Sequence, residues 1–182
     1  MAEHTLSSGS ICRPYRSPWG AFPVRSMPIS TGVSSLAINL GQLVISDTRT
    51  STCEHRIKAS IVSGEANIVG IAAEGVSGAA AVVDTEIPVW EANPLVEFRA
   101  NTKGGALVSS IVGSARTLAW DSTLNINYVD VGASTAGDNR VVVTELIDAI
   151  GDTGGAVAFR FLASDRRSTN NSSVAFLALY GR

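Results

Sequence analysis

The residues of this chain that could bind a metal ion are few. Cys53, Glu54 and His55 form the one cluster of candidate ligands, and within a strand Cys53 and His55 would share a face. A tetrahedral site needs more ligands, and only Cys12 and His4, both near the N-terminus, remain to supply them. We therefore expect these residues to be structural, and we expect no metal and no cofactor.

Two glycine-rich stretches resemble catalytic motifs only superficially. GASTAG, Gly132 to Gly137, is one residue longer than the G-x-S-x-G nucleophile elbow, and no helix is predicted after it. GDTGG, Gly151 to Gly155, contains the Asp-Thr-Gly triplet of aspartic proteases, but its neighbours are ordinary strands. A tight turn that uses Asp and Gly for their backbone freedom is the better interpretation. The chain has no GxxxxGK phosphate loop.

A pair of carboxylates is the remaining candidate for acid–base chemistry. Glu91 and Glu97 could face each other, but they alternate with Trp90 and Phe98, which places them on the outer, wet face. An acid catalyst needs a shielded pocket that raises its pKa, so a solvated face is the better interpretation. The three tryptophans could stack on sugars, although in a small β protein such residues are more often core or interface residues. These residues favour a protein that is not an enzyme.

Composition points to contact with other chains. Only 16% of the 182 residues are charged and 45% are hydrophobic, whereas an average globular protein has roughly 25% charged residues. Either part of the surface faces another chain or the surface is a neutral one of Ser, Thr, Asn and Gly. The net charge of −2 argues against a nucleic-acid binder. No apolar run is long enough to span a membrane, and the start of the chain lacks signal-peptide features, so we expect synthesis in the cytoplasm.

Short apolar runs separated by turn residues predict an all-β fold, a single antiparallel barrel or sandwich. The clearest run is IPVWEANPLVEFRA, Ile87 to Ala100, in which two alternating segments flank Asn93-Pro94 and predict a hairpin. No strongly periodic helix is present. Further strands are predicted near residues 36–40, 43–45, 56–62, 67–72, 118–131, 140–150, 156–163 and 174–180.

Residues 1–30 are predicted to form an extended N-terminal arm, with the β body at 31–182. Four of the six prolines lie in this stretch, and proline excludes a regular helix or an inner strand. Large apolar residues occur among the prolines, so we expect the arm to lie on its own body or on a neighbouring subunit. The residues predicted to make these contacts are Arg13, Tyr15, Arg16, Trp19, Phe22 and Arg25.

The order of the segments resembles that of the capsid decoration, or cement, proteins of tailed bacteriophages. The resemblance covers about residues 30–165 and consists of apolar and glycine positions. The segments that carry it are GVSSLAINLGQLVIS (32–46), NIVGIAAEG (67–75), IPVWEANPLVEFRANT (87–102), SSIVGSARTLAWD (109–121) and GGAVAFRFLAS (154–164).

This resemblance implies a non-enzymatic virion protein on the outer capsid surface. Such proteins are small β-barrels that clamp adjacent capsomers, commonly as trimers, so the implied partners are the major capsid protein and further copies of this chain in a homotrimer. No nucleic acid and no membrane are implied. A carbohydrate-binding β-barrel of a head spike or fibre, used in host attachment, is the alternative. A small hydrolase is the third hypothesis, and the scarcity of acid–base pairs disfavours it.

Overall fold

The structure is a computed structural model, and it describes residues 11–30, 37–47, 56–65, 67–76, 85–132 and 138–162. Over these residues the protein is all β, as predicted, with one short 3-10 helix, η2 (Ser109–Ile111), and no α-helix. The strands are β1 (Arg13–Arg16), β2 (Val24–Pro28), β3 (Leu43–Asp47), β4 (Arg56–Ala59), β5 (Ile68–Ala72), β6 (Glu86–Glu91), β7 (Glu97–Lys103), β8 (Ala115–Asp121), β9 (Ile126–Asp130), β10 (Asn139–Leu146) and β11 (Ala156–Phe161).

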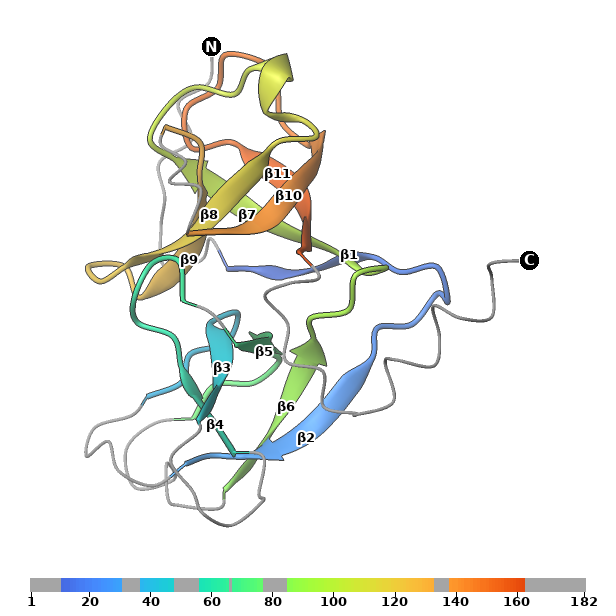
Figure 1. Cartoon of the computed structure of the whole chain (residues 1–182), viewed down its shortest axis with the longest axis vertical. Helices are drawn as coiled ribbons and strands as arrows, with labels where there is room; N and C mark the ends of the chain where they lie inside the picture. The colour runs from blue at the N-terminus through green and yellow to red at the C-terminus, as the bar shows by residue number, and fades with distance from the viewer. Residues whose placement is uncertain are drawn as a thin grey trace.

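The C-terminal strands form a closed ring, here called the second barrel and drawn at the top of Figure 1. Its order is β7-β11-β10-β8-β9, with antiparallel neighbours throughout. Parallel pairing of Thr102 with Val129 and of Lys103 with Asp130 then joins β9 back to β7 and closes the ring. β1 adds to the same edge of β7 as β9, further toward the start of β7, and makes this sheet six-stranded.

The strands β2 to β6 form the first barrel, below the second in Figure 1. The order is β2-β6-β5-β3-β4, again antiparallel. Directly after β2, Ile29 bridges Ile57 of β4 in parallel, and the amide of Ser30 donates to the carbonyl of Ile57 at 2.9 Å. This narrow contact closes the first barrel.

The two barrels have the same strand order, a repeat that no motif in the sequence predicts. In each, the first strand pairs with the fifth, the fifth with the fourth, the fourth with the second and the second with the third, all antiparallel. The third strand then returns parallel to the first. The strand pair β2–β6 in the first barrel takes the place of β7–β11 in the second, and Met27, Ile87, Phe98 and Phe159 of these pairs are all buried. The expectation of a single barrel or sandwich is therefore corrected to two barrels.

The predicted hairpin at Ile87 to Ala100 is also wrong. Both of its strands exist as β6 and β7, but they do not pair with each other, because β6 belongs to the first barrel and β7 to the second. Residues 92–96 between them are the link that joins the two barrels. Alternation of apolar and polar residues predicts that a segment is a strand, but it does not say which strand it pairs with.

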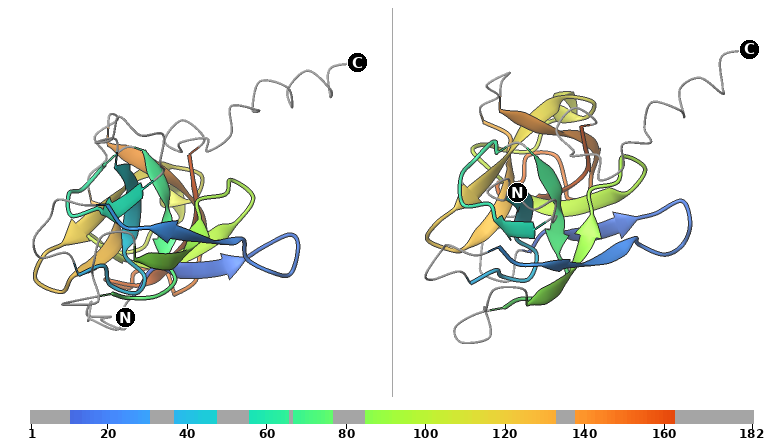
Figure 2. Two further views of the ribbon diagram at one scale, coloured as in Figure 1. Left: turned by 90° about the horizontal axis from the view of Figure 1, so that it is seen from below. Right: turned by 60° about the horizontal axis from the view of Figure 1, so that its bottom comes forward.

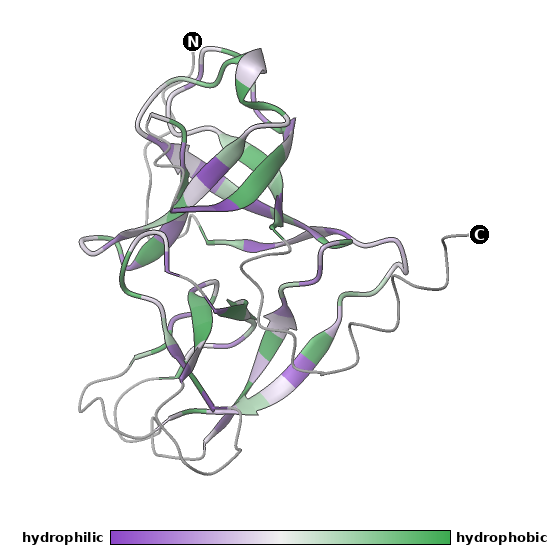
Figure 3. Cartoon of the chain, in the orientation of Figure 1, coloured by the Kyte–Doolittle hydropathy of each residue, from purple (hydrophilic) through white to green (hydrophobic). Residues whose placement is uncertain are grey.

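Each barrel has an apolar interior. The interior of the second barrel centres on three phenylalanines, Phe98, Phe159 and Phe161, whose ring centroids are 5.1 to 6.0 Å apart. Figure 3 shows apolar residues gathered along β3 and β5 and alternating with polar ones along β2. The buried cluster of the first barrel contains Met27, Ile29, Ile38, Val44, Ile57, Ala59, Val69, Ala72, Ile87 and Val89.

The barrels are fused through β3 and β5, which are buried on both faces. On β3, Val44 points into the first barrel, while Leu43 and Ile45 belong to the same apolar cluster as the interior of the second barrel. Asn127 of β9, 1% exposed, spans the junction: its Oδ1 accepts from the amide of Leu43 at 2.7 Å and its Nδ2 donates to the carbonyl of Ala119 at 3.2 Å. The apolar cluster of the second barrel thus extends onto the outward sides of β3 and β5, while the interior of the first barrel is a cluster of its own.

The predicted arm is not a separate unit beyond residue 10. β1 is an edge strand of the second barrel, and β2 is the first strand of the first barrel, with Met27 and Ile29 in its core. Cys12 is fully buried against both barrels. The boundary predicted at residue 30 therefore falls inside the first barrel. Residues 1–10 and the strand predicted at 174–180 lie outside the described residues.

Candidate functional site

The predicted contact residues surround the connection between β1 and β2, residues 17–23, which projects from the side of the molecule in both views of Figure 2. Its turn begins with Ser17-Pro18, and Pro18 suits the first central position of a β-turn. The amide of Gly20 donates to the carbonyl of Ser17 at 3.3 Å, and Gly20 has φ +72°. At its far end the loop is tied to β6, because the carbonyl of Pro23 accepts from the amide of Glu91 at 3.1 Å.

This turn places Trp19 at its tip, with 57% of the residue exposed. A tryptophan in a monomeric protein usually buries most of its large apolar surface, so an exposed one on a constrained turn indicates a contact surface. Phe22 lies on the other side of the loop, partly buried and packed against the core. The loop therefore has one aromatic residue that anchors it to the protein and one that points to solvent.

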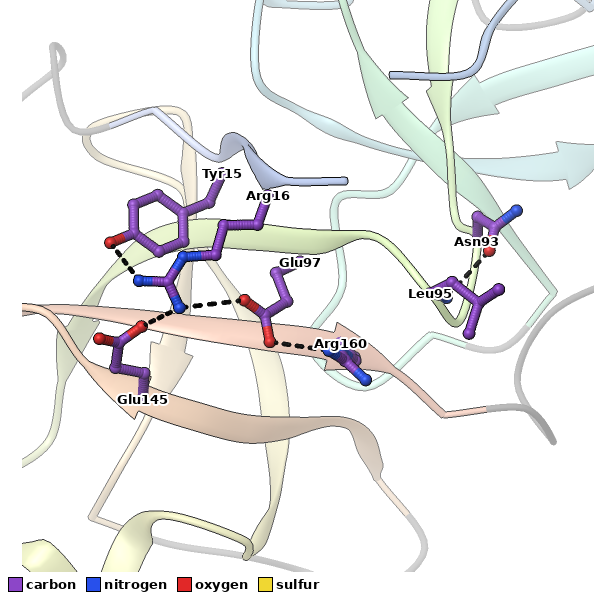
Figure 4. A network of polar contacts seen from close by, with 7 residues as sticks. All are labelled: Tyr15, Arg16, Asn93, Leu95, Glu97, Glu145 and Arg160. Carbon is purple, nitrogen blue, oxygen red and sulfur yellow. Dashed lines mark hydrogen bonds and ion pairs between the residues drawn. The ribbon is translucent and has the colours of Figure 1, made fainter. Parts of the chain in front are cut away.

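Two more exposed apolar residues lie in the first barrel's edge strand and in the link between the barrels. Val24, 53% exposed, begins β2 and is directly opposite Trp90 of β6. Leu95, 52% exposed, lies in the link between the barrels, where its amide donates to Oδ1 of Asn93 at 2.9 Å (Figure 4).

Arg16, predicted to contact a partner, instead binds its own chain. Its guanidinium lies 2.6 Å from Oε2 of Glu145 and 3.7 Å from Oε2 of Glu97, and it also donates to the Tyr15 hydroxyl at 3.2 Å (Figure 4). The Arg16 carbon Cζ lies 4.6 Å from the centre of the Tyr15 ring. The hydrogen bond to Glu145 raises the pKa of Arg16 above its ordinary value. These contacts fix β1 to β7 and β10.

Glu97 is the residue of this network that sequence reasoning misplaced. It was expected to be solvated, yet it is 7% exposed, because Arg16 covers it from one side and Arg160 donates to its Oε1 at 3.0 Å from the other. Charge-assisted hydrogen bonds of this kind are among the stronger polar contacts in proteins. Arg160 lies 63 residues away in sequence, so only the pairing of β7 with β11 brings the two together. The network is structural, and it makes the base of the projecting loop rigid.

Arg13 and Arg25 are the two remaining predicted contact residues, and both are exposed. Arg13 stands on β1 opposite Arg99, and Arg25 stands on β2 opposite Val89. They lie on different sheets, so the structure places them at the two ends of the projecting loop rather than in one cluster.

No group of three or more metal-ligating side chains occurs within the described ranges. His4, Cys53, Glu54 and His55 lie outside those ranges, as does most of the GASTAG stretch. The GDTGG stretch lies in the connection between β10 and β11, with Gly151 at φ +96° and Gly154 at φ +70°. No helix in the part of the chain that the structure describes is long and apolar enough to cross a membrane.

Comparison with protein-family models, with curated proteins and with solved structures found no match to this chain.

Proposed function

We propose that this chain is a non-enzymatic structural protein that decorates the outer surface of a phage head and clamps neighbouring capsid subunits. The observation that carries the proposal is Trp19, held outward on a short turn whose two ends are fixed to rigid sheets. The resemblance of segment order to capsid decoration proteins supports the same function. A clamp needs a stiff body and a preorganised contact residue, and two barrels packed together through β3 and β5 supply the stiffness.

The surface around Trp19 fits protein better than sugar. Residues 17–24 contain no Asn, Asp or Glu, the polar partners that a sugar-binding tryptophan needs beside it. Val24 and Leu95 add apolar area, and Arg13 and Arg25 add positive charge for an acidic capsid surface. Binding of the isolated chain to a glycan array would favour the alternative of a host-attachment protein.

The test uses heads of the phage that encodes the chain, assembled without this protein and then mixed with purified protein. The measured quantity is the occupancy of these heads by Trp19→Ala, compared with that by the wild type. Truncation of a central aromatic contact costs about 2 kcal/mol or more, so we expect a loss of affinity of roughly 30-fold. Ile150→Ala is the matched control, because Ile150 is 64% exposed in the β10–β11 connection, far along the chain from the projecting loop. Equal occupancy by Trp19→Ala and wild type would show that the loop is not part of the contact. Failure of the wild-type chain to bind any head would refute the proposed function.

A further inference from the structure

The outward face of the second barrel has two arginines side by side. On β7, Phe98 and Ala100 point into the barrel, so Arg99 between them points outward. Arg13 of β1 is directly opposite Arg99 in the antiparallel pair, and residues at opposite positions share one face of the sheet, with Cβ atoms about 5 Å apart. Sequence reasoning named Arg13 as a contact residue but did not single out Arg99.

Neither arginine of this pair has a partner within the described part of the chain, where no side chain forms an ion pair or a hydrogen bond with either guanidinium. On the other side of Arg99, the opposite residue of β11 is Ala158, which has no charge. Arg13 is exposed and Arg99 is half-buried. Like charges at directly opposite positions destabilise a sheet, so the pair destabilises the free chain.

The two glutamates on this part of the face are already paired. Arg160 donates to Oε1 of Glu97 at 3.0 Å, and the Arg16 guanidinium lies 2.6 Å from Oε2 of Glu145 (Figure 4). Four arginines against two glutamates leave these six side chains with a net charge of +2. The whole chain has a net charge of −2, so its remaining residues together have −4. This face is thus opposite in charge to the rest of the protein.

We propose that Arg13 and Arg99 together bind carboxylates of an acidic surface on a partner protein. A guanidinium is planar and offers parallel N–H donors that match the two oxygens of a carboxylate. A carboxylate placed between two such groups accepts hydrogen bonds from both and offsets the repulsion between them. Arg13 is six residues before Trp19, so one strand and its turn supply both contacts. The identity of the partner rests on the proposed function, under which it is a capsid subunit.

The position of the pair favours carboxylates over phosphates. Phosphate sites usually collect backbone amides, at helix N-termini or in glycine-rich loops. The backbone amides of β1 and β7 lie in the plane of the sheet and are directed along it, so only side chains face a ligand here. Nucleic acid requires an extended basic surface, whereas these two charges belong to a chain of net charge −2. An acidic protein surface is therefore the partner that the pair fits.

The experiment measures the occupancy of phage heads, assembled without this protein, by purified variants of the full chain. Arg99→Gln and Arg13→Gln should each bind about 10-fold more weakly than the wild type, because each loses charge-assisted hydrogen bonds. The double variant should be little weaker than either single one, because both arginines bind the same group. Lys58→Gln is the control. Lys58 is half-buried on β4 in the other sheet, so the same charge is lost there and the occupancy should match that of the wild type.

The stability of the free chain separates a binding role from a structural one. Arg99→Gln removes the repulsion from Arg13, so its midpoint of urea unfolding should equal or exceed that of the wild type. An arginine that held the fold together would show the opposite change. If Arg99→Gln lowers the unfolding midpoint and the occupancy together, the pair is structural and the proposal is wrong.

A titration of the purified chain with a short glutamate peptide tests the pair without the heads. The amide NMR signals of Arg13 and Arg99 should shift in the wild type, and the same positions should not respond in the double variant. Inorganic phosphate at the same ionic strength should cause no saturable shift. A saturable shift with phosphate would assign the pair to phosphate and overturn the assignment to carboxylates.

The outcomes also separate this proposal from the proposed function. If the wild type binds heads and both single variants bind equally well, the role of the pair is overturned while the proposed function stands. If the wild type binds no head, the proposed function is refuted and the glutamate titration decides on the pair. A shift at Arg13 and Arg99 then supports the carboxylate site, and the absence of a shift overturns it.

Discussion

Asn127 offers the sharpest test of how the two barrels are joined. The change Asn127→Ala leaves the amide of Leu43, a residue with no exposed surface, without its 2.7 Å acceptor. A buried donor left unpaired costs about 1–3 kcal/mol, and the small cavity left by the side chain adds about 1 kcal/mol. We therefore expect the free energy of unfolding to fall by about 2–4 kcal/mol.

The assay is urea unfolding followed by tryptophan fluorescence, together with amide hydrogen exchange at Leu43. The wild type should unfold in one transition, because the apolar cluster of the second barrel includes residues of β3 and β5. In Asn127→Ala, exchange at Leu43 should accelerate more than exchange inside either barrel. Asn101→Ala is the control, since Asn101 is only partly buried and donates to the carbonyl of Gly154 at 2.8 Å, where water can replace it. A change below about 0.5 kcal/mol for Asn127→Ala, or one equal to that of Asn101→Ala, would refute this account of the junction.

Three further predictions concern single contacts. Glu97→Gln should lower the free energy of unfolding by about 1–3 kcal/mol, measured by urea unfolding, because it removes the charge from a carboxylate held between two guanidiniums. The hydrogen bond from Lys103 lowers the pKa of Asp121, so this contact stabilises the fold above pH about 4 and is lost as the pH falls through the lower folded-state pKa. The stability difference between wild type and Asp121→Asn should accordingly shrink on acidification, and a difference that is constant between pH 7 and pH 3 would contradict it. Gly70→Ala should cost more than about 3 kcal/mol in thermal or urea unfolding, because its Cβ would lie 2.1 Å from the carbonyl oxygen of Trp90, and an unchanged midpoint would show that the strands separate easily.

Much of the secondary structure could be predicted from local pattern, whereas the pairing could not. The segments around Val44, Ile71 and Val157 are apolar enough to be read as strands, and the structure has β3, β5 and β11 there. The repeat was hidden because the two barrels share strand order and not residue types: their first strands read VRSMP in β2 and EFRANTK in β7. Many different side chains can fill a buried position, so a shared topology leaves little trace in one sequence.

The candidate site shows the same division. The role of Trp19 as a contact residue was predicted from its proline-rich setting. Prolines on both sides exclude a regular helix or an inner strand there. The engagement of Arg16 by its own chain could not be foreseen, since Glu97 and Glu145 are 81 and 129 positions further along and adjoin it only through the sheet. Long-range ion pairs depend on strand order, and strand order was the part of the fold that the pattern left open.

The fusion of the barrels through β3 and β5 also leaves the two barrels with different outward surfaces. The outward side of β5 has Ile68 and Ile71, which the second barrel covers. The equivalent outward side of β10 has Arg140, Val142 and Thr144, half-buried residues of which two are polar. A third unit stacked in the same way would have to desolvate an arginine and a threonine hydroxyl without an apolar surface to gain. The outward side of β5 is therefore an interface, whereas the outward side of β10 is suited to water.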